Sequence, residues 1–238
     1  MLLPIISLSV CVLATVVFIL VSLLKGGKWG LITKIFASLC FVVAGLLAVL
    51  NMYETFDPNT ATSPTWAWFV FTGLVMGLVG DIFMDLKEKE LPAHDVFLNT
   101  GMLSFGIGHF MYFAGLTLCV TLRCHFLIPT AIAIVIGAVI TLLIFLNAGS
   151  LGIKWGKFKW QSFTYSLVLT IMFVYAVAIA VLDKTMWMFA VGVALFLLSD
   201  LILSLIYFAG KKTNTMRALN WSTYYLAQQT LVLFMFLI

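Results

Sequence analysis

Two aspartates lie inside stretches that are apolar enough to span a bilayer. Asp81 occurs in the run GLVMGLVGDIFMDL, and Asp200 occurs in ALFLLSDLILSLIYF. Placing a carboxylate deep in a membrane helix costs about 2.5 kcal/mol or more, so such a residue usually marks a functional site or a buried pair. Two carboxyl groups can carry out general acid–base chemistry when one is protonated and the other is ionised. Asp81 and Asp200 are therefore the candidate catalytic residues.

Other polar side chains recur at helical spacing in the same apolar stretches. Asp85 follows Asp81 by four residues and shares its helix face, although it lies nearer the helix end, where interfacial water would solvate it. A polar stripe near the C-terminus must face protein or water, because lipid cannot satisfy it. The candidate substrate-binding residues are Asp85, His109, Tyr112, Asn220, Tyr224, Tyr225 and Gln228. We expect one cavity, open toward the inner leaflet, to gather them. A lone histidine such as His109 is also typical of a structural hydrogen bond, and the glycines before Asp81 are typical of close helix packing.

Two common hydrolase chemistries lack their residues in this chain. Of the three histidines, His94 and His125 fall in loops on opposite sides of the membrane, so a three-histidine zinc site cannot form. No GxSxG motif is present to supply a serine nucleophile. We therefore expect neither a metal nor another cofactor.

The composition predicts the elements that position these residues. Of 238 residues, 63% are hydrophobic and 9% are charged, with a mean hydropathy of +1.17, whereas soluble domains carry about 25% charged residues. Windows of about 20 apolar residues match the thickness of a bilayer core. They predict an all-α transmembrane bundle in a single membrane domain, 1–238, with spans at about 2–24, 29–51, 65–86, 96–120, 126–147, 160–182, 185–209 and 217–238.

The basic residues predict the orientation of the spans. Alternate connections hold eleven of the thirteen: Lys25, Lys28, Lys34, Lys87, Lys89, Lys154, Lys157, Lys159, Lys211, Lys212 and Arg217. The opposite side has only Arg123 and Lys184. By the positive-inside rule, both termini face away from the cytoplasm. The net charge of +4 thus reflects membrane topology and requires no nucleic-acid partner.

An internal repeat is a further hypothesis. An offset of 119 residues, half the chain, places Asp81 on Asp200 and His109 on Gln228. This spacing predicts two parallel four-helix halves related by an axis along the membrane normal. The alternative is that regularly spaced spans coincide at this offset by chance.

The ordered set of polar motifs resembles the YhhN family of eight-span membrane proteins, which includes the lysoplasmalogenases. The resemblance runs from the second span onward and depends on Gly80-Asp81 followed by Asp85, on Gly101, Phe105, His109 and Tyr112, on Ser199-Asp200, and on Tyr224-Tyr225-Leu226-Ala227-Gln228. It implies hydrolysis of the vinyl-ether bond of a lysophospholipid taken from the bilayer. It also implies that Asp81 and Asp200 are the catalytic pair and that Tyr225, Gln228, His109 and Tyr112 line the site. The membrane would be the cell membrane in a bacterium or the endoplasmic reticulum in a eukaryote.

Such a reaction needs a proton on the β-carbon of the vinyl ether and water on the resulting oxocarbenium ion. Two carboxyl groups suffice, with the deeper Asp200 as acid and Asp81 as base, although the opposite assignment is open. Lys34 and Arg217, near the inner rim, are candidates to bind the headgroup phosphate, or they are ordinary positive-inside anchors.

Two other functions fit the same residues. Paired aspartates in a repeat also suit a proton- or ion-coupled transporter. A non-catalytic lipid-binding or scaffold protein would use the aspartates only to pair with Arg217 or a lysine. The oligomeric state is open.

Overall fold

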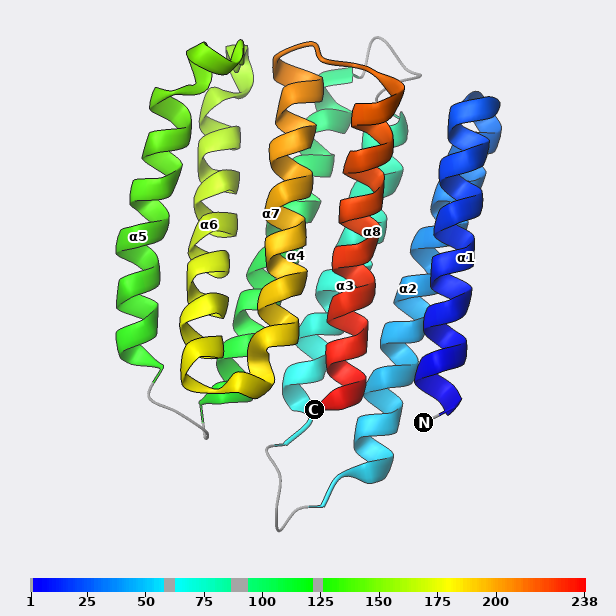
Figure 1. Ribbon diagram of the computed structural model, residues 1–238, viewed down its shortest axis with the longest axis vertical. Helices are drawn as coiled ribbons and strands as arrows, with labels where there is room; N and C mark the ends of the chain where they lie inside the picture. Colours follow the sequence, from blue (N-terminus) through cyan, green and yellow to red (C-terminus); the bar gives the residue numbers. More distant parts are fainter. Residues whose placement is uncertain (1, 58–62, 87–93, 122–125) are drawn as a thin grey trace. The chain divides into compact units, whose positions relative to one another are not determined.

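The computed structural model describes residues 2–57, 63–86, 94–121 and 126–238, and all regular structure in these ranges is helical (Figure 1). Three short 3₁₀ turns, Ala148–Leu151, Gly156–Phe158 and Lys184–Met186, interrupt the connections in the second half of the chain. The long helices are α1 (Leu2–Leu24), α2 (Gly27–Thr55), α3 (Thr65–Leu86), α4 (His94–Val120), α5 (Leu127–Leu146), α6 (Lys159–Leu182), α7 (Trp187–Phe208) and α8 (Asn214–Leu237).

The predicted all-α fold is confirmed, and each predicted span corresponds to one of these helices within a few residues. Apolar runs of this length become helices because a helix satisfies every backbone hydrogen bond within the segment, as lipid requires. Some residues used in the sequence analysis lie outside the described residues. They are Lys87, Lys89 and Arg123, which were used to predict the orientation, and His125 and the side chain of His94, which were used to exclude a zinc site.

Within the described residues, seven helices, α1 to α7, are long and apolar enough to cross a membrane. This composition makes the chain an integral membrane protein. The eighth predicted span is present as helix α8, which is less apolar than the others because it carries the polar stripe. A helix of this kind needs protein partners for its polar side chains.

The chain forms two compact units. Unit 1 comprises residues 1–123 and 228–238, and unit 2 comprises residues 124–227. The boundary between α4 and α5 lies close to the middle of the chain, where the repeat hypothesis divides it. The repeat and the single membrane domain both remain predictions.

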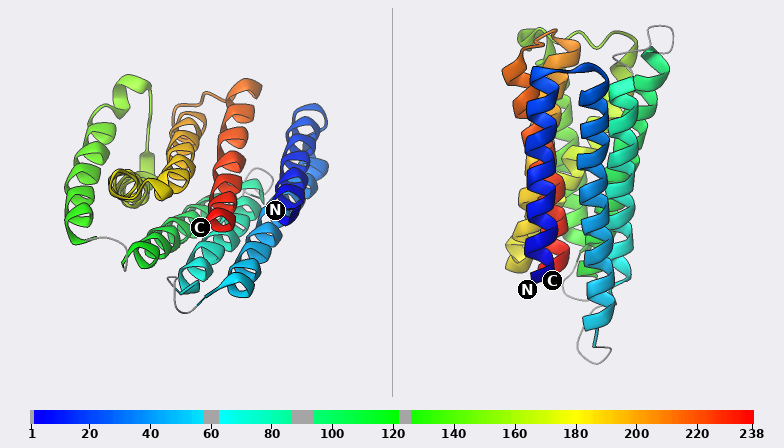
Figure 2. Two further views of the ribbon diagram at one scale, coloured as in Figure 1. Left: turned by 60° about the horizontal axis from the view of Figure 1, so that its bottom comes forward. Right: turned by 90° about the vertical axis from the view of Figure 1, so that its right-hand side faces the viewer.

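In unit 1, α1 packs on α2, α2 on α3, and α3 on α4. The end of α8 joins them: Gln229 donates a hydrogen bond to the Thr15 hydroxyl of α1 at 2.9 Å, and the Phe234 ring lies 5.5 Å from that of Trp66 on α3. Figures 1 and 2 show that α1 begins and α8 ends at the same end of this unit. Two glycines with positive φ, Gly26 and Gly27, make the tight turn from α1 to α2.

In unit 2, α5 packs on α6 and α6 on α7. Gly137 allows α5 and α6 to approach closely, because a Cβ at this position would lie 2.8 Å from the backbone of Ile171. The hydroxyls of Thr141 and Thr170 meet across the same contact at 2.7 Å. A glycine and two hydroxyl-bearing residues thus let these two helices approach closely.

Candidate functional site

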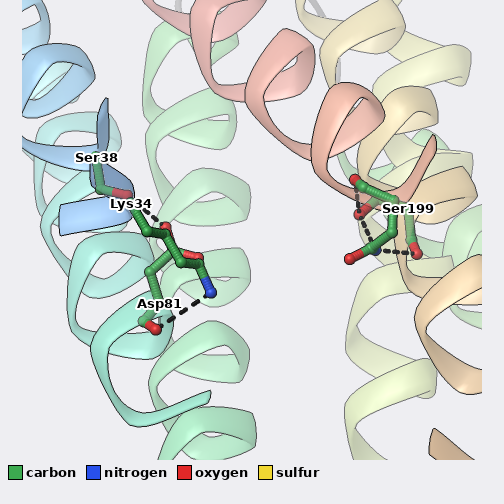
Figure 3. A network of polar contacts seen from close by, with 5 residues as sticks. Lys34, Ser38, Asp81 and Ser199 are labelled. Atoms are coloured by element: carbon green, nitrogen blue, oxygen red, sulfur yellow. Dashed lines mark hydrogen bonds and ion pairs between the residues drawn. The ribbon is translucent and has the colours of Figure 1, made fainter. Parts of the chain in front are cut away.

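Asp81 lies on α3 and is only 3% exposed. Ser38 of α2 donates a hydrogen bond to its Oδ2 at 2.7 Å, and the Lys34 Nζ lies 3.4 Å from its Oδ1 (Figure 3). The same Nζ donates to the main-chain oxygen of Asp81 at 3.3 Å. Because Lys34 and Ser38 are four residues apart, they share one face of α2, and this face meets Asp81.

Burial makes this ion pair unusual. Lys34 is 7% exposed, although lysines are almost never fully buried unless they are paired. Lys34 was predicted as a ligand for a headgroup phosphate, but here its ammonium contacts the carboxylate of Asp81. Removing either partner would leave a charge in a low-dielectric environment, so the two residues act as one unit.

Asp85 lies one turn further along α3 and is half-buried. This exposure agrees with a carboxylate near the helix end. The lysines expected beside it, Lys87 and Lys89, lie outside the described residues. A substrate-binding role for Asp85 remains a prediction.

On α4, the Tyr112 hydroxyl donates a hydrogen bond to Oε1 of Gln228 on α8 at 2.7 Å. Both side chains are buried, and the His109 ring is buried with its centre 6.3 Å from that of Tyr112. Gly73 of α3 makes room for Tyr112, because a Cβ there would lie 2.3 Å from the tyrosine ring. Three predicted site residues from α4 and α8 are therefore brought together in unit 1.

Glycines determine how closely α3 and α4 approach. A Cβ at Gly80, the residue before Asp81, would lie 2.7 Å from the ring of Phe105. A Cβ at Gly108 of α4 would lie 3.2 Å from the main-chain oxygen of Gly73. The glycines before Asp81 thus serve close packing, as expected for small residues at membrane helix contacts.

In unit 2, Asp200 of α7 is half-buried and accepts a hydrogen bond from the Tyr165 hydroxyl of α6 at 2.5 Å. Tyr165 is absent from the predicted site. One signal for it exists in the sequence, because a tyrosine within an apolar span needs a partner for its hydroxyl. Hydropathy alone cannot identify that partner, which depends on the rotation of α6 against α7.

Ser199, the residue before Asp200, links α7 to α8 through hydrogen bonds. Asn220 donates to the main-chain oxygen and to the hydroxyl of Ser199, both at 2.9 Å, and the Ser199 hydroxyl donates to the main-chain oxygen of Asn220 at 3.3 Å. Tyr224 and Tyr225 follow on α8, are buried, and pack ring against ring at 5.1 Å. The polar stripe of α8 therefore faces protein, as predicted. Arg217 is half-buried in the first turn of the same helix.

The predicted residues thus fall into two groups. Unit 1 holds Lys34, Asp81, Asp85, His109, Tyr112 and Gln228, and unit 2 holds Asp200, Arg217, Asn220, Tyr224 and Tyr225. Each aspartate has polar partners from the preceding helix of its own unit. The cavity expected to gather both groups remains a prediction.

Comparison with known proteins identifies the chain at the family level. No curated protein and no solved structure matches it. A model of the YhhN family matches residues 29–235, which covers every candidate site residue described above. The chain belongs to the YhhN family.

Proposed function

We propose that this protein is a membrane-embedded hydrolase that cleaves the vinyl-ether bond of lysoplasmalogens. The observation that carries the proposal is the pair of intramembrane carboxyl groups, each with its own polar partners on a neighbouring helix, in a chain of the YhhN family. Buried carboxyl groups in unlike environments are suited to the separate roles of acid and base.

In the proposed reaction, the acid transfers its proton to the β-carbon of the vinyl ether, which leaves an oxocarbenium ion. The base takes a proton from water while the water oxygen attacks that ion. As the resulting hemiacetal collapses, the protonated base gives its proton to the ether oxygen, which leaves as an alcohol, and the ionised acid takes the proton of the hemiacetal hydroxyl. The products are a fatty aldehyde and a glycerophospho-headgroup. One water is consumed, and the acid and base return to their starting protonation states.

The contacts support Asp81 as the base. Lys34 places a cation beside its carboxylate and Ser38 donates to it, an arrangement suited to an ionised group. Asp200 accepts a hydrogen bond from the hydroxyl of Tyr165, which is a neutral donor. We therefore assign Asp200 as the acid.

The remaining candidates would hold the lipid. In this proposal Tyr112, Gln228, His109, Asn220, Tyr224 and Tyr225 line the path of the substrate from the bilayer, and Arg217 binds the headgroup phosphate. Both termini face away from the cytoplasm, following the distribution of the basic residues.

Aldehyde release from lysoplasmenylethanolamine by the purified protein in detergent tests this function. We expect wild-type turnover, and we expect D81N and D200N each to reduce it by about 10²- to 10⁴-fold, the usual contribution of general acid–base catalysis. The matched control is E54Q, because Glu54 is an exposed carboxylate at the end of α2. Full turnover in D81N or D200N would refute the assignment of that residue.

The same protein in sealed vesicles distinguishes the rival functions. Uptake of the lipid without aldehyde release would favour the transporter. If neither occurs, and K34M alone is less stable than wild type, the ion pair of Asp81 serves only structure, as in the scaffold alternative.

A further inference from the structure

One end of unit 2 concentrates exposed lysines. The connection from α5 to α6 and the connection from α7 to α8 lie at the same end of this unit (Figure 1). We call their exposed lysines the basic rim: Lys154, Lys157, Lys159, Lys211 and Lys212. No Asp or Glu occurs in residues 147–182 or 201–238, so nearby carboxylates in these segments cannot neutralise the rim.

The lysines of the α5–α6 connection lie next to buried apolar residues in the sequence. Ile153, just before Lys154, is buried, and so are Trp155 and Phe158, which lie between the lysines. The Trp155 ring stacks on Phe145 of α5 at 4.5 Å, nearly parallel, and lies 4.9 Å from the ring of Phe208 at the end of α7. This alternation of buried apolar residues and exposed lysines fixes the direction in which the charges point.

A main-chain hydrogen bond ties the two connections together: the Lys154 N–H donates to the Phe208 oxygen at 2.8 Å. Three ammonium groups lie over aromatic rings, Lys157 over Phe158 at 5.5 Å, Lys159 over Trp160 at 5.9 Å, and Lys212 over Tyr207 at 5.8 Å. Trp160 is itself exposed, and exposed tryptophans are typical of the level of the lipid headgroups.

The start of α6 adds donors for an anion. α6 has no side-chain cap, whereas the hydroxyl of Thr213 accepts from the Met216 N–H at the start of α8. The helix dipole favours a negative ligand at such a terminus. The indole N–H of Trp155 is buried and has no hydrogen-bond partner among the described residues, so it too needs an acceptor.

We propose that the basic rim is a docking site for the phosphate-bearing headgroups of anionic phospholipids. The positive-inside rule requires only basic residues near a span. It explains neither the buried aromatic residues Trp155 and Phe158 beside the lysines nor the lack of a side-chain cap at the start of α6. The exposed Trp160 beside Lys159 places the rim at headgroup depth, which favours a membrane lipid over free phosphate. The site is independent of the proposed hydrolysis.

Native mass spectrometry of the detergent-purified protein, mixed with equimolar phosphatidylglycerol and phosphatidylcholine, tests this site. We expect wild type to retain phosphatidylglycerol preferentially. K157Q/K159Q should weaken phosphatidylglycerol binding about fivefold per lysine, roughly 25-fold in total, and leave phosphatidylcholine binding unchanged. K157R/K159R keeps both charges and should bind as wild type does.

The matched control is K25Q/K28Q, which removes two exposed lysines from the α1–α2 connection of unit 1. It should keep the phosphatidylglycerol preference. Equal losses in the two glutamine variants, or no lipid preference in wild type, would overturn the proposal. Displacement of the lipid by an equal concentration of inorganic phosphate would also overturn it. The melting temperature of each variant shows that lost binding is not lost folding.

Discussion

Asp81 and Asp200 both lie on the third helix of their units, and each accepts a hydrogen bond from the second helix. Their surroundings differ in charge and in burial. Asp81 is almost fully buried against an ammonium and a serine hydroxyl, whereas Asp200 is half-buried against the hydroxyl of Tyr165. The preceding residue also differs, since Gly80 admits the ring of Phe105 and Ser199 is bonded to Asn220. Two carboxyl groups on the third helix of a unit thus have different surroundings, which an acid–base pair requires.

The strongest test of this difference removes the Lys34 ammonium that lies beside Asp81. K34M should lower the free energy of unfolding by about 3–5 kcal/mol, because it leaves the Asp81 carboxylate buried without its partner. Denaturant titration in detergent micelles measures the loss. Adding D81N should restore most of it, because no buried charge is then left unpaired. If K34M is as stable as wild type, the ion pair does not distinguish the two aspartates.

The residues before the aspartates give a second comparison. G80A should cost about 1–3 kcal/mol, because its Cβ would lie 2.7 Å from the Phe105 ring, which must shift. The control is G149A, where nothing lies within 4 Å of the added atom. Thermal unfolding of both variants measures the difference. Equal stability of G80A and G149A would show that Gly80 has no packing role.

The change in unit 2 that corresponds to K34M should have a smaller effect. Y165F removes one hydrogen bond to a carboxyl group that is protonated in the proposed mechanism, and it should cost about 0.5–1.5 kcal/mol of unfolding free energy in the denaturant titration. Phenylalanine keeps the ring and its packing, so the change isolates the hydroxyl. A loss as large as that of K34M would show that the two environments are energetically alike.

Ser199 should show the smallest effect. S199A removes the hydroxyl bonded to Asn220 and should cost about 0.6 kcal/mol, the average for hydrogen bonds between membrane helices. A double-mutant cycle with N220A measures the coupling between the two side chains. No coupling would mean that the main-chain oxygen of Ser199, rather than its hydroxyl, holds Asn220.

Hydropathy predicted the helices well because bilayer thickness fixes the length of an apolar run. The intramembrane position of Asp81 and Asp200 and the inward face of the α8 stripe could be predicted for the same reason, since lipid excludes polar groups. Ser38 and Tyr165 could not be predicted as partners. Hydropathy reports the depth of a residue but not the rotation of its helix, and rotation decides which side chains meet.

The function of Lys34 illustrates this limit. From its place in the sequence, Lys34 is one of several lysines near the inner ends of the spans. Such a lysine could bind a headgroup phosphate or serve as an ordinary positive-inside anchor. Its position one turn before Ser38 on the face toward α3 makes it the counter-ion of Asp81 instead. Only the packing of α2 on α3 distinguishes these roles.

Helix α8 has a consequence for biosynthesis. It is less apolar than the seven helices before it, and its Asn220 and Gln229 have partners on α7 and α1. It would partition poorly into lipid alone, but it follows α1 and α7 along the chain, so it leaves the ribosome after both of its partner helices. The order of helices along the chain is then also an order of assembly, in which α1 and α7 are in place before α8 pairs with them.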